Sequence, residues 1–463
     1  MSRRFKELGL ISIGLVAGIA VSLHFSAVAE KEMPLPLPVE ELRAFSDVFG
    51  RIKSDYVEPV SDKKLITEAI NGMLSGLDPH SAYLDAEGFK ELQVGTQGEF
   101  GGLGIEVGME DGLVKVISPI EDTPAFKAGI QSGDLIIKLD DTLVKGLTLN
   151  DAVKRMRGKP GSTIRLTVVR KSEPKPFQVD IVRAVIKVQS VKYKLPEPGY
   201  GFVRITQFQE HTGENLAAAL ADLSKQNKAP LQGLVLDLRN DPGGLLTAAV
   251  GVSAAFLPKD ALVVYTEGRT DDARMRLLAS PDYYLRGNKQ DYLKDLPGEF
   301  GNVPMVVLVN GGSASASEIV AGALQDHKRA VIMGTQSFGK GSVQTILPLG
   351  NNTAIKLTTA RYYTPSGRSI QAKGIEPDII VEDPATAAFD STLRLREADL
   401  DKHLSNGQLE QPGNVTKPAR KAAPKNKDES TDKIEVAEFG AKNDYQLNQA
   451  LNLLKGMSIL RGK

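Results

Sequence analysis

One segment of the sequence surrounds a serine with features that could make its hydroxyl a nucleophile. Residues 309–318 read Val-Asn-Gly-Gly-Ser-Ala-Ser-Ala-Ser-Glu, so an apolar strand pattern gives way to glycines and then to a helix of small residues. Such a corner would place Ser315 at a helix N-terminus, where unpaired N–H groups and the helix dipole favour developing negative charge. The pattern also fits an ordinary helix cap, because Glu318 stands three positions after Ser315.

A serine nucleophile needs a base, and the five histidines of the chain are poorly placed for this role. His24 lies in the N-terminal apolar segment, His403 in a polar tail, and His80 after a turn outside the expected catalytic core. His211 and His327 stay open as alternatives, but neither lies in a glycine-rich loop. The sequence therefore gives little support to a Ser-His-Asp triad.

Lys340 fits the role of the base better. It lies in Gly-Lys-Gly-Ser-Val-Gln at 339–344, a glycine-rich turn that enters a strand. Burial and a nearby positive helix terminus would lower the pKa of a lysine from about 10.4 toward roughly 7–8. Gln344 would share a face with Lys340 if the strand continues, and could then orient the amine. The alternative is a solvated loop charge.

A third segment could stabilise an oxyanion. An apolar strand pattern at 234–238 breaks into a Pro-Gly-Gly turn that contains Gly243 and Gly244. Backbone N–H groups exposed on this turn could form an oxyanion hole together with the N–H of Ala316. A tight turn without catalytic function is the other interpretation, because glycine is the usual residue there.

Composition and motifs argue against nucleotides and nucleic acids as ligands. Residues 334–340 match the first seven positions of a phosphate-binding loop, but Gly341 replaces the Ser or Thr that would bind Mg²⁺. Lys+Arg and Asp+Glu both number 57, so the basic excess of a nucleic-acid-binding protein is missing. The chain has no cysteine, which excludes disulfides, thiolate nucleophiles and Cys-ligated metals.

The first 29 residues have the pattern of an export signal. Arg3, Arg4 and Lys6 precede an uncharged, mostly apolar run at 8–23, and Ala-Val-Ala at 27–29 fits a cleavage site. An uncleaved membrane anchor is the alternative, although the run is shorter than the roughly twenty residues of a membrane span. Either interpretation puts the rest of the chain outside the cytoplasm.

Apolar periodicity divides the following residues into regions that must position the candidate site. Residues 30–96 are predicted to be helical, with amphipathic stretches at 39–57 and 65–74. Residues 97–185 change to short Val- and Ile-rich runs between Gly, Pro and Asp turns, with one helix at 149–156. This second pattern indicates a small α+β unit.

The remaining residues are predicted to form an α/β core, a polar linker and a terminal helix. Buried-type strands and helices alternate over 186–383. Residues 384–435 are polar and rich in Lys, Pro and Ala, which is typical of a mobile linker. Residues 436–463 contain an amphipathic helix at 444–460, whose apolar stripe either docks on the core or contacts another subunit.

Together these segments resemble the carboxyl-terminal processing, or tail-specific, serine proteases. The resemblance covers about Val39 to Val381. Four motifs carry it: Gly-Ser-Ala-Ser-Ala-Ser-Glu at 312–318, Gly-Lys-Gly-Ser-Val-Gln at 339–344, Asp-Leu-Arg-Asn-Asp-Pro-Gly-Gly at 237–244 and Gly-Leu-Asp-Pro-His-Ser-Ala-Tyr-Leu at 76–84. It implies a multidomain α/β protein with a crotonase/ClpP-like core, an inserted PDZ domain, and helical N- and C-terminal segments.

The resemblance also assigns roles to residues. It implies that Ser315 is the nucleophile, Lys340 the base and Gln344 its support, with no cofactor and no metal. The oxyanion hole would be formed by Ala316 with one of the two glycines, Gly243 or Gly244.

Residues 97–185 resemble a PDZ domain, the usual companion of this catalytic core. Its carboxylate-binding loop would contain Gly102, Leu103, Gly104 and Ile105, whose N–H groups would bind the C-terminal carboxylate of a substrate. The peptide would add as a strand beside 104–107, with the helix at 149–156 as the other wall. In relatives this domain also gates the active site.

The expected function is that of an exported endopeptidase of the periplasm or cell envelope, which cuts proteins with apolar C termini. Relatives act on envelope proteins that include cell-wall hydrolases, assemble through terminal helices, and in some cases depend on a lipoprotein adaptor. A PDZ scaffold without activity and a crotonase-like acyl-transfer enzyme are the rival interpretations. A scaffold has no need of Lys340 or Gln344, and an exported chain would not meet acyl-CoA.

Overall fold

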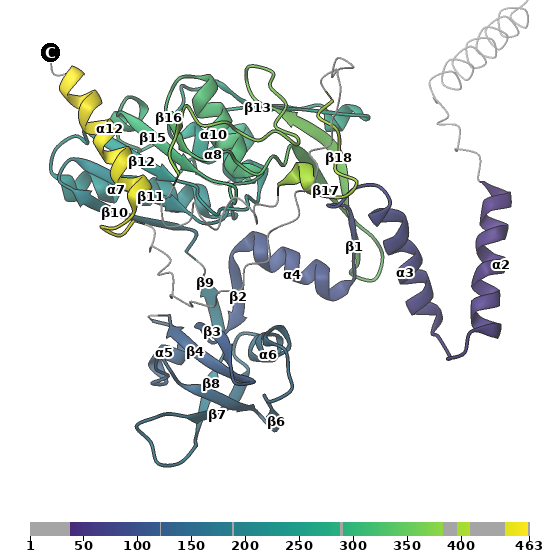
Figure 1. Ribbon diagram of the computed structural model, residues 1–463. Coiled ribbons are helices and arrows are strands. Elements are labelled where there is room, and N and C mark those ends of the chain that lie inside the picture. Colours follow the sequence, from purple (N-terminus) through teal and green to yellow (C-terminus); the bar gives the residue numbers. More distant parts are fainter. Residues whose placement is uncertain are drawn as a thin grey trace, which may run out of the picture. The chain divides into compact units, whose positions relative to one another are not determined.

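A computed structural model describes most of the chain (Figure 1). The described residues are 38–120, 122–187, 189–287, 290–382, 396–407 and 440–461. The predicted signal at 1–29 lies outside them, as does most of the predicted linker. The chain separates into two compact parts, residues 1–69 and 70–463.

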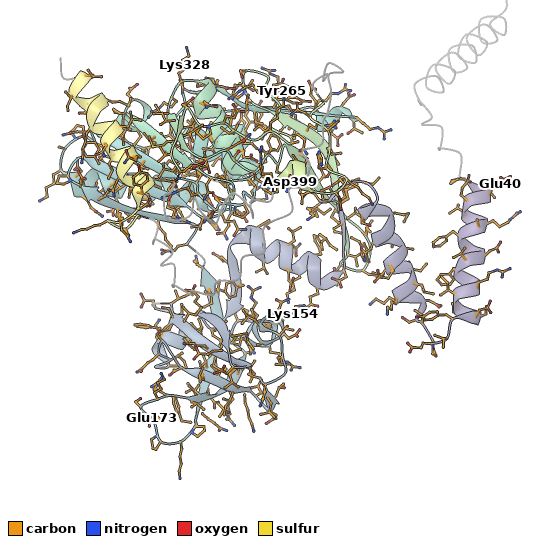
Figure 2. The ribbon with its side chains drawn as sticks, in the orientation of Figure 1. Glu40, Lys154, Glu173, Tyr265, Lys328 and Asp399 are labelled. Atoms are coloured by element: carbon orange, nitrogen blue, oxygen red, sulfur yellow. The ribbon has the colours of Figure 1, made fainter. Side chains whose placement is uncertain are left out.

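The first part contains helix α2 (Val39–Asp55) and the beginning of helix α3 (Asp62–Ser75), which confirms both helices expected here. No residue of α2 is buried, and its apolar side chains Leu42, Phe45 and Val48 are 50%, 47% and 57% exposed. Figure 2 draws the side chains of this helix, with Glu40 labelled. None of the helices in the described ranges is long and apolar enough to cross a membrane.

The prediction of an all-helical segment up to residue 96 is wrong after α3. Strand β1 (Ala82–Leu84) follows a turn and pairs with β18 (Ala354–Tyr363), and helix α4 (Ala86–Gln97) comes next. The Gly-Leu-Asp-Pro-His-Ser motif therefore leads into a sheet of the second part. His80, predicted to lie outside the core, stands just before this strand.

Residues 99–187 contain the predicted α+β unit. A short antiparallel pair, β2 (Glu99–Gly102) and β9 (Ala184–Lys187), stands where the chain enters and leaves it. Within the unit the antiparallel strand order is β3-β4-β5-β7-β8, with β6 paired to β5 and β3 at an edge. The elements are β3 (Ile105–Glu110), β4 (Leu113–Pro119), α5 (Pro124–Lys127), β5 (Leu135–Leu139), β6 (Thr142–Leu143), α6 (Leu149–Met156), β7 (Thr163–Val169) and β8 (Phe177–Val182).

A six-stranded sheet forms the centre of the α/β core, in the order β10-β11-β12-β15-β16-β19. All its ladders are parallel except that between β10 and β11. The strands are β10 (Val191–Glu197), β11 (Tyr200–Ile205), β12 (Gly233–Asp237), β15 (Met305–Val309), β16 (Val331–Gly334) and β19 (Ile379–Ile380). Because β12 and β15 are parallel neighbours, the loops at their carboxyl ends meet at one edge.

Helices α7 (Thr212–Asn227), α8 (Leu246–Ala254) and α10 (Ala316–Asp326) join this sheet through one large apolar cluster. A second, antiparallel sheet was not predicted. It has the order β1-β18-β13-β14, with β17 also paired to β18. Its other strands, with the short helices nearby, are β13 (Leu262–Gly268), β14 (Arg276–Leu278), β17 (Ser342–Pro348), η1 (Asp271–Ala273), α9 (Pro281–Tyr284) and η2 (Gly298–Gly301).

The C-terminal helix α12 (Tyr445–Arg461) packs on the core, which decides between the two readings of its apolar stripe. Leu447, Leu451 and Leu454 are buried in a cluster with side chains of β11, β12 and β15. These leucines of the stripe are thus covered by this same chain.

Part of the predicted mobile linker is in fact packed. Residues 396–407 include the short helix η3 (Glu397–Asp399). Glu397 and Asn406 are buried there, and both bond to Gln371 of the core. Asp399, labelled in Figure 2, marks this segment.

Candidate active site

Ser315 stands at the corner between strand β15 and helix α10. Its backbone has φ +54° and ψ −112°, a left-handed conformation that is unfavourable for a residue with a side chain. The turn before it is fixed to the neighbouring strand, because Ser313 Oγ donates to the carbonyl of Leu238 at 2.8 Å. The strand–turn–helix corner expected from the sequence is therefore present, and it holds Ser315 in a strained geometry.

The carboxylate of Glu318 joins this corner to the loop of Lys340. One oxygen accepts from the N–H groups of Ser315 at 2.8 Å and Lys340 at 2.9 Å. The other accepts from Ser337 Oγ at 2.6 Å and from the N–H of Gly339 at 2.7 Å. The Glu318 side chain thus does more than complete a capping box, since it also holds the loop of Lys340, 22 positions further along the chain.

Burial dominates the electrostatics of both residues. Burial raises the pKa of Glu318 to about 7, although four donors favour the ionised form. For Lys340, burial and then the positive charge of Lys356 lower the pKa, against the acids Glu397, Glu318 and Asp78. A lowered pKa increases the fraction of neutral amine near neutral pH, which is what a general base requires.

Tyr362 is a neighbour of both candidate catalytic residues that sequence reasoning missed. The hydroxyl of this buried residue of β18 donates to the carbonyl of Lys340. A side-chain hydrogen bond with Ser315 opposes the rise in the pKa of Tyr362 that burial causes. Tyr362 therefore bridges the serine and the lysine loop, and no motif in the sequence indicated this.

Gln344 lies on strand β17 (Ser342–Pro348), which follows Lys340. Lys340 lies before β17, and a bulge falls between Val343 and Gln344, so the alternation of a regular strand does not connect the two residues. The Gln344 amide instead donates to Ser342 Oγ at 3.0 Å and to Thr358 Oγ1 at 3.3 Å. The NH₂ group of Gln344 is thereby bonded to β17 and β18, so a hydrogen bond from an amine would have to be accepted by its Oε1.

The Pro-Gly-Gly turn packs directly against Ser315. A Cβ on Gly243 would lie 2.8 Å from both Ser315 Cβ and the Ala316 nitrogen, and Gly243 has φ +95°. The N–H of Gly243 donates to Asp241 Oδ1 at 2.8 Å. By contrast, the N–H groups of Gly244 and Ala316 have no hydrogen-bond partner within the described residues. Gly244 is therefore the better candidate for the second oxyanion donor.

Asp241 fixes this turn and is itself unusual. It is fully buried, and burial raises its pKa to about 7. Its carbonyl accepts from Ala314 N–H at 3.0 Å and Ser317 Oγ at 2.9 Å, on either side of the serine. Asp241 Oδ2 is buried without a hydrogen bond to any described residue.

The loop predicted to bind a C-terminal carboxylate lies between β2 and β3 and includes Gly102, Leu103, Gly104 and Ile105. The N–H groups of Leu103 and Gly104 have no hydrogen-bond partner in the described ranges. A Cβ on Gly104 would lie 2.2 Å from Thr123, and its φ is +78°. The adjacent β3 is an edge strand, so a peptide could add beside it.

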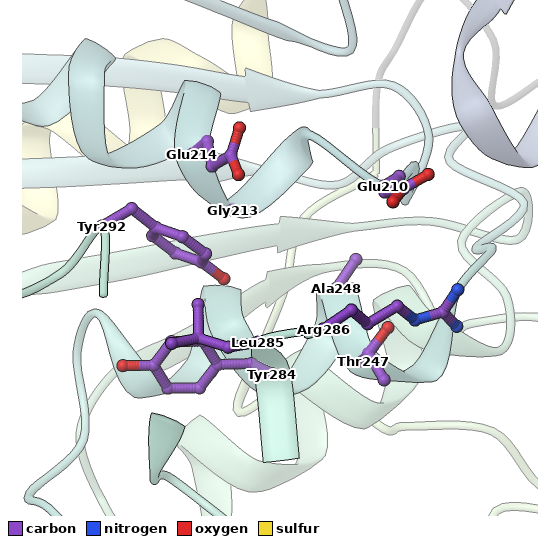
Figure 3. A pocket seen from close by; sticks show the side chains of 9 residues that line it. All are labelled: Glu210, Gly213, Glu214, Thr247, Ala248, Tyr284, Leu285, Arg286 and Tyr292. Atoms are coloured by element: carbon purple, nitrogen blue, oxygen red, sulfur yellow. The ribbon is translucent and has the colours of Figure 1, made fainter. Parts of the chain in front are cut away.

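His327 and His211, which the sequence left open as alternative bases, bond to groups other than Ser315. His327 Nε2 bonds to the carbonyl of Leu262 at 2.7 Å, and His211 Nδ1 bonds to Glu214 at 3.0 Å. Figure 3 shows a pocket near the N-terminus of α7. Its lining residues are Glu210, Gly213, Glu214, Thr247, Ala248, Tyr284, Leu285, Arg286 and Tyr292, and they include none of the candidate catalytic residues.

Comparison with known proteins gives three family matches. Peptidase family S41 matches residues 199–381, the PDZ domain family matches 101–181, and the activating protease CtpB N-terminal domain matches 21–88. A carboxy-terminal-processing protease of Bartonella bacilliformis is 48% identical over 421 residues, which is 90% of this chain and 89% of that protein.

Two further relatives match smaller shares of this chain. The carboxy-terminal processing protease CtpB of Bacillus subtilis is 37% identical over 337 residues, 72% of this chain and 66% of that protein. A solved structure of a photosystem II D1 C-terminal processing protease is 29% identical, with a TM-score of 0.41, and the match covers 77% of this chain and 91% of that one.

Proposed function

Since this chain belongs to the carboxy-terminal-processing proteases of peptidase family S41, a serine-type family, we propose that it is an exported endopeptidase that cleaves envelope proteins near their C termini. In this proposal Ser315 is the nucleophile and Lys340 the base. The observation that supports it most directly is the position of the Glu318 carboxylate. One of its oxygens accepts hydrogen bonds from the N–H groups of both Ser315 and Lys340, so the two loops are bonded to the same side chain.

The first half of the reaction would form an acyl-enzyme. Neutral Lys340 takes the proton of the Ser315 hydroxyl as Oγ attacks the carbonyl carbon of the substrate. The N–H groups of Ala316 and Gly244 stabilise the oxyanion of the tetrahedral intermediate. The Lys340 ammonium then gives its proton to the leaving amine, and the C–N bond breaks.

The second half would regenerate the enzyme. Lys340 removes a proton from water, whose oxygen attacks the acyl carbon. Collapse of the second tetrahedral intermediate breaks the ester bond and returns the proton from Lys340 to Ser315 Oγ. Gln344 would support the amine through its Oε1, because its NH₂ group already donates to Ser342 and Thr358.

Substrate recognition is assigned to the PDZ domain. The free N–H groups of Leu103 and Gly104 would bind a terminal carboxylate, with Gly102 and Ile105 completing the loop. Ile105 and Val107 of β3 face the same apolar cluster as Leu149 of α6, which favours apolar residues in the substrate tail. The same proposal includes a second role for the PDZ domain, in which it controls access of substrates to the active site.

Location and partners complete the proposal. The basic, apolar and Ala-Val-Ala segments at 1–29 indicate export to the periplasm or cell envelope, with membrane association if the segment is retained. Substrates would be proteins with apolar C termini, such as cell-wall hydrolases. A lipoprotein adaptor and assembly into a homo-oligomer through α2 are part of the same proposal.

The test compares mature wild-type protein with Ser315→Ala on an unfolded substrate with an apolar C terminus, with and without a candidate adaptor. Cleavage by the wild type alone is expected, because only the wild type has the nucleophile. Equal cleavage by both proteins would overturn the assignment.

A serine-reactive fluorophosphonate separates the enzyme from its rivals. Labelling of Ser315 in the wild type is expected even without an adaptor. A protein that binds the apolar tail but neither cleaves nor labels would instead be a scaffold.

A further inference from the structure

The turn at residues 78–81 is bonded to the strands around Lys340 by two separate routes. On the first route, the buried Asp78 carboxylate accepts from Ser81 Oγ at 2.7 Å and from Thr358 Oγ1 at 3.1 Å. Thr358 in turn accepts from the Gln344 amide at 3.3 Å. This route connects the turn to the strand that follows Lys340.

The second route runs through two buried side chains. His80 Nε2 lies 2.8 Å and 3.0 Å from the two carboxylate oxygens of Glu397, whose side chain is 1% exposed. Glu397 also accepts from Gln371 Nε2 at 2.9 Å, and Gln371 Oε1 accepts from the N–H of Gly341 at 3.0 Å. Because Gly341 follows Lys340 directly, this route ends at the peptide next to the proposed base.

The glycine at the end of this route cannot move freely. A Cβ on Gly341 would lie 2.3 Å from the backbone nitrogen of Gln371, so the two backbones are in close contact. Glu397 adds a second tie to the same loop, because its own N–H donates to the carbonyl of Phe338 at 3.1 Å. The loop of Lys340 is thus held from both sides by Glu397 and Gln371.

Glu397 also acts on Lys340 through its charge. Glu397 is ionised, since hydrogen bonds from His80 and Gln371 outweigh its burial and lower its pKa. The charged groups that face Lys340 are Glu397, Glu318 of α10 and Asp78 of the turn, which favour the ammonium ion, and Lys356 of β18, which opposes it. The Tyr362 hydroxyl faces the Lys340 carbonyl.

We propose that His80 and Glu397 are positioning residues for Lys340, which fix the Gly341 peptide through Gln371 and set the pH at which the lysine becomes a neutral base. An ionised carboxylate can only accept, so His80 Nε2 carries the hydrogen of this bond. The inference rests on the proposed role of Lys340. It makes the Asp-Pro-His-Ser motif part of the catalytic machinery, although it lies some 260 positions before the lysine.

The test uses the full-length mature protein and the rate at which a fluorophosphonate labels Ser315, measured from pH 5 to 10. Glu397→Gln keeps an acceptor for His80 but removes the charge. We therefore expect the acid limb of the pH profile to move to lower pH by about 0.5–1 unit. His80→Ala should label about tenfold more slowly, whereas His80→Gln, which keeps a donor, should recover at least half of the wild-type rate.

Hydrogen exchange separates positioning from loss of folding. His80→Ala should speed amide exchange in the 336–345 peptide while its melting temperature stays within a few degrees of the wild type. His211→Ala and Glu214→Gln, from a more exposed His–Glu pair, serve as controls and should leave exchange and labelling unchanged.

The outcomes distinguish this inference from the proposed function. If Ser315 labels in the wild type but the Glu397→Gln profile and the His80→Ala exchange match the wild type, only the inference fails. If Ser315 does not label at any pH, or labels equally in Lys340→Ala, the proposed function fails and takes this inference with it.

Discussion

Arg239 and Asp444 lie 205 positions apart and meet in a buried ion pair. Arg239 Nη2 is 2.7 Å from Asp444 Oδ2, and Nη1 is 3.0 Å from Oδ1. Arg239 stands between strand β12 and the Pro-Gly-Gly turn, while Asp444 accepts from the N–H of Leu447 in the first turn of α12. The last helix of the chain is thereby fixed to the strand that leads to the proposed oxyanion hole.

Removing one partner of this pair should destabilise the core. Asp444→Ala leaves the Arg239 guanidinium buried with one carboxylate fewer, which we expect to cost on the order of 3 kcal/mol. The free energy of unfolding in urea measures the effect. The control is Lys455→Ala, which removes an exposed pair between α12 and Glu197 and should cost less than about 1 kcal/mol. Equal losses in both variants would contradict the importance of the buried pair.

Gly243→Ala should remove activity without unfolding the protein. The new methyl group would meet Ser315, Ala314 and Ala316 at 2.7–2.8 Å, and the backbone at φ +95° is unfavourable for alanine. We expect a loss of about 10²–10³ in kcat, comparable to the loss of an oxyanion donor, because the methyl group would displace Ser315 and the N–H of Ala316. Gly311→Ala is the matched control in the neighbouring turn, because a Cβ there has nothing within 4 Å. A similar loss of kcat in Gly311→Ala would mean that any substitution in these turns lowers activity, whether or not it contacts Ser315.

The corner at Ser315 could be predicted because strand, glycine turn and helix follow one another in the sequence. The parallel neighbours β12 and β15 then bring the Pro-Gly-Gly turn to that corner, as expected for an α/β core. The reach of Glu318 could not be predicted. Its spacing from Ser315 indicated only a local cap, whereas its bond to the Lys340 N–H depends on how a distant loop folds back.

Glu318→Gln should disrupt both candidate catalytic loops at once. The carboxylate accepts four hydrogen bonds, and a glutamine offers one acceptor oxygen, so two donors would face an NH₂ group. We expect a loss of about 2 kcal/mol or more in unfolding free energy, and about 100-fold in activity. Urea unfolding and peptide cleavage are the measurements, with exposed Glu376→Gln as the control. A Glu318→Gln variant with wild-type activity and stability would show that the carboxylate is not needed to hold the loops of Ser315 and Lys340.

The second sheet and segment 396–407 were missed for a physical reason. Thr358 and Lys356 lie on a strand that is half-buried on both faces, so β18 has no clear alternation of apolar and polar residues. Glu397 lies in a stretch whose composition is typical of disorder, and its bonds to His80 and Gln371 are what hold it in place. Composition reports on the average of a segment and cannot reveal a few specific buried bonds.

Lys340→Met should remove activity and raise stability in a pH-dependent way. Burial and then Lys356 lower the pKa of Lys340, so the unfolded chain binds this proton more tightly than the folded protein. The resulting cost to stability is full below the folded pKa and falls as pH rises toward the ordinary value of 10.5. The gain of Lys340→Met over the wild type should therefore be larger at pH 7 than at pH 10, in urea unfolding at each pH.

Activity provides the second readout for this variant. Loss of a general base lowers the rate by about 10²–10⁴. Exposed Lys373→Met is the control for removing a charge from the neighbouring loop. A variant with near wild-type cleavage would exclude Lys340 as the base, and a stability gain that did not fall between pH 7 and 10 would exclude a buried ammonium at this position.

Helix α2 exposes the apolar stripe that the sequence indicated, among the residues that the structure describes. Phe45 and Leu42 are 47% and 50% exposed, and α2 buries none of its residues. A stripe of this kind is stable in water only if something covers it, and a second copy of the chain would present the same stripe. Phe45→Asp should therefore lower the molar mass measured by light scattering. Asp47→Asn, two positions on and so on the other side of the helix, should leave the mass unchanged. An unchanged mass in Phe45→Asp, with the helical content intact by circular dichroism, would mean that copies of this chain do not assemble through α2.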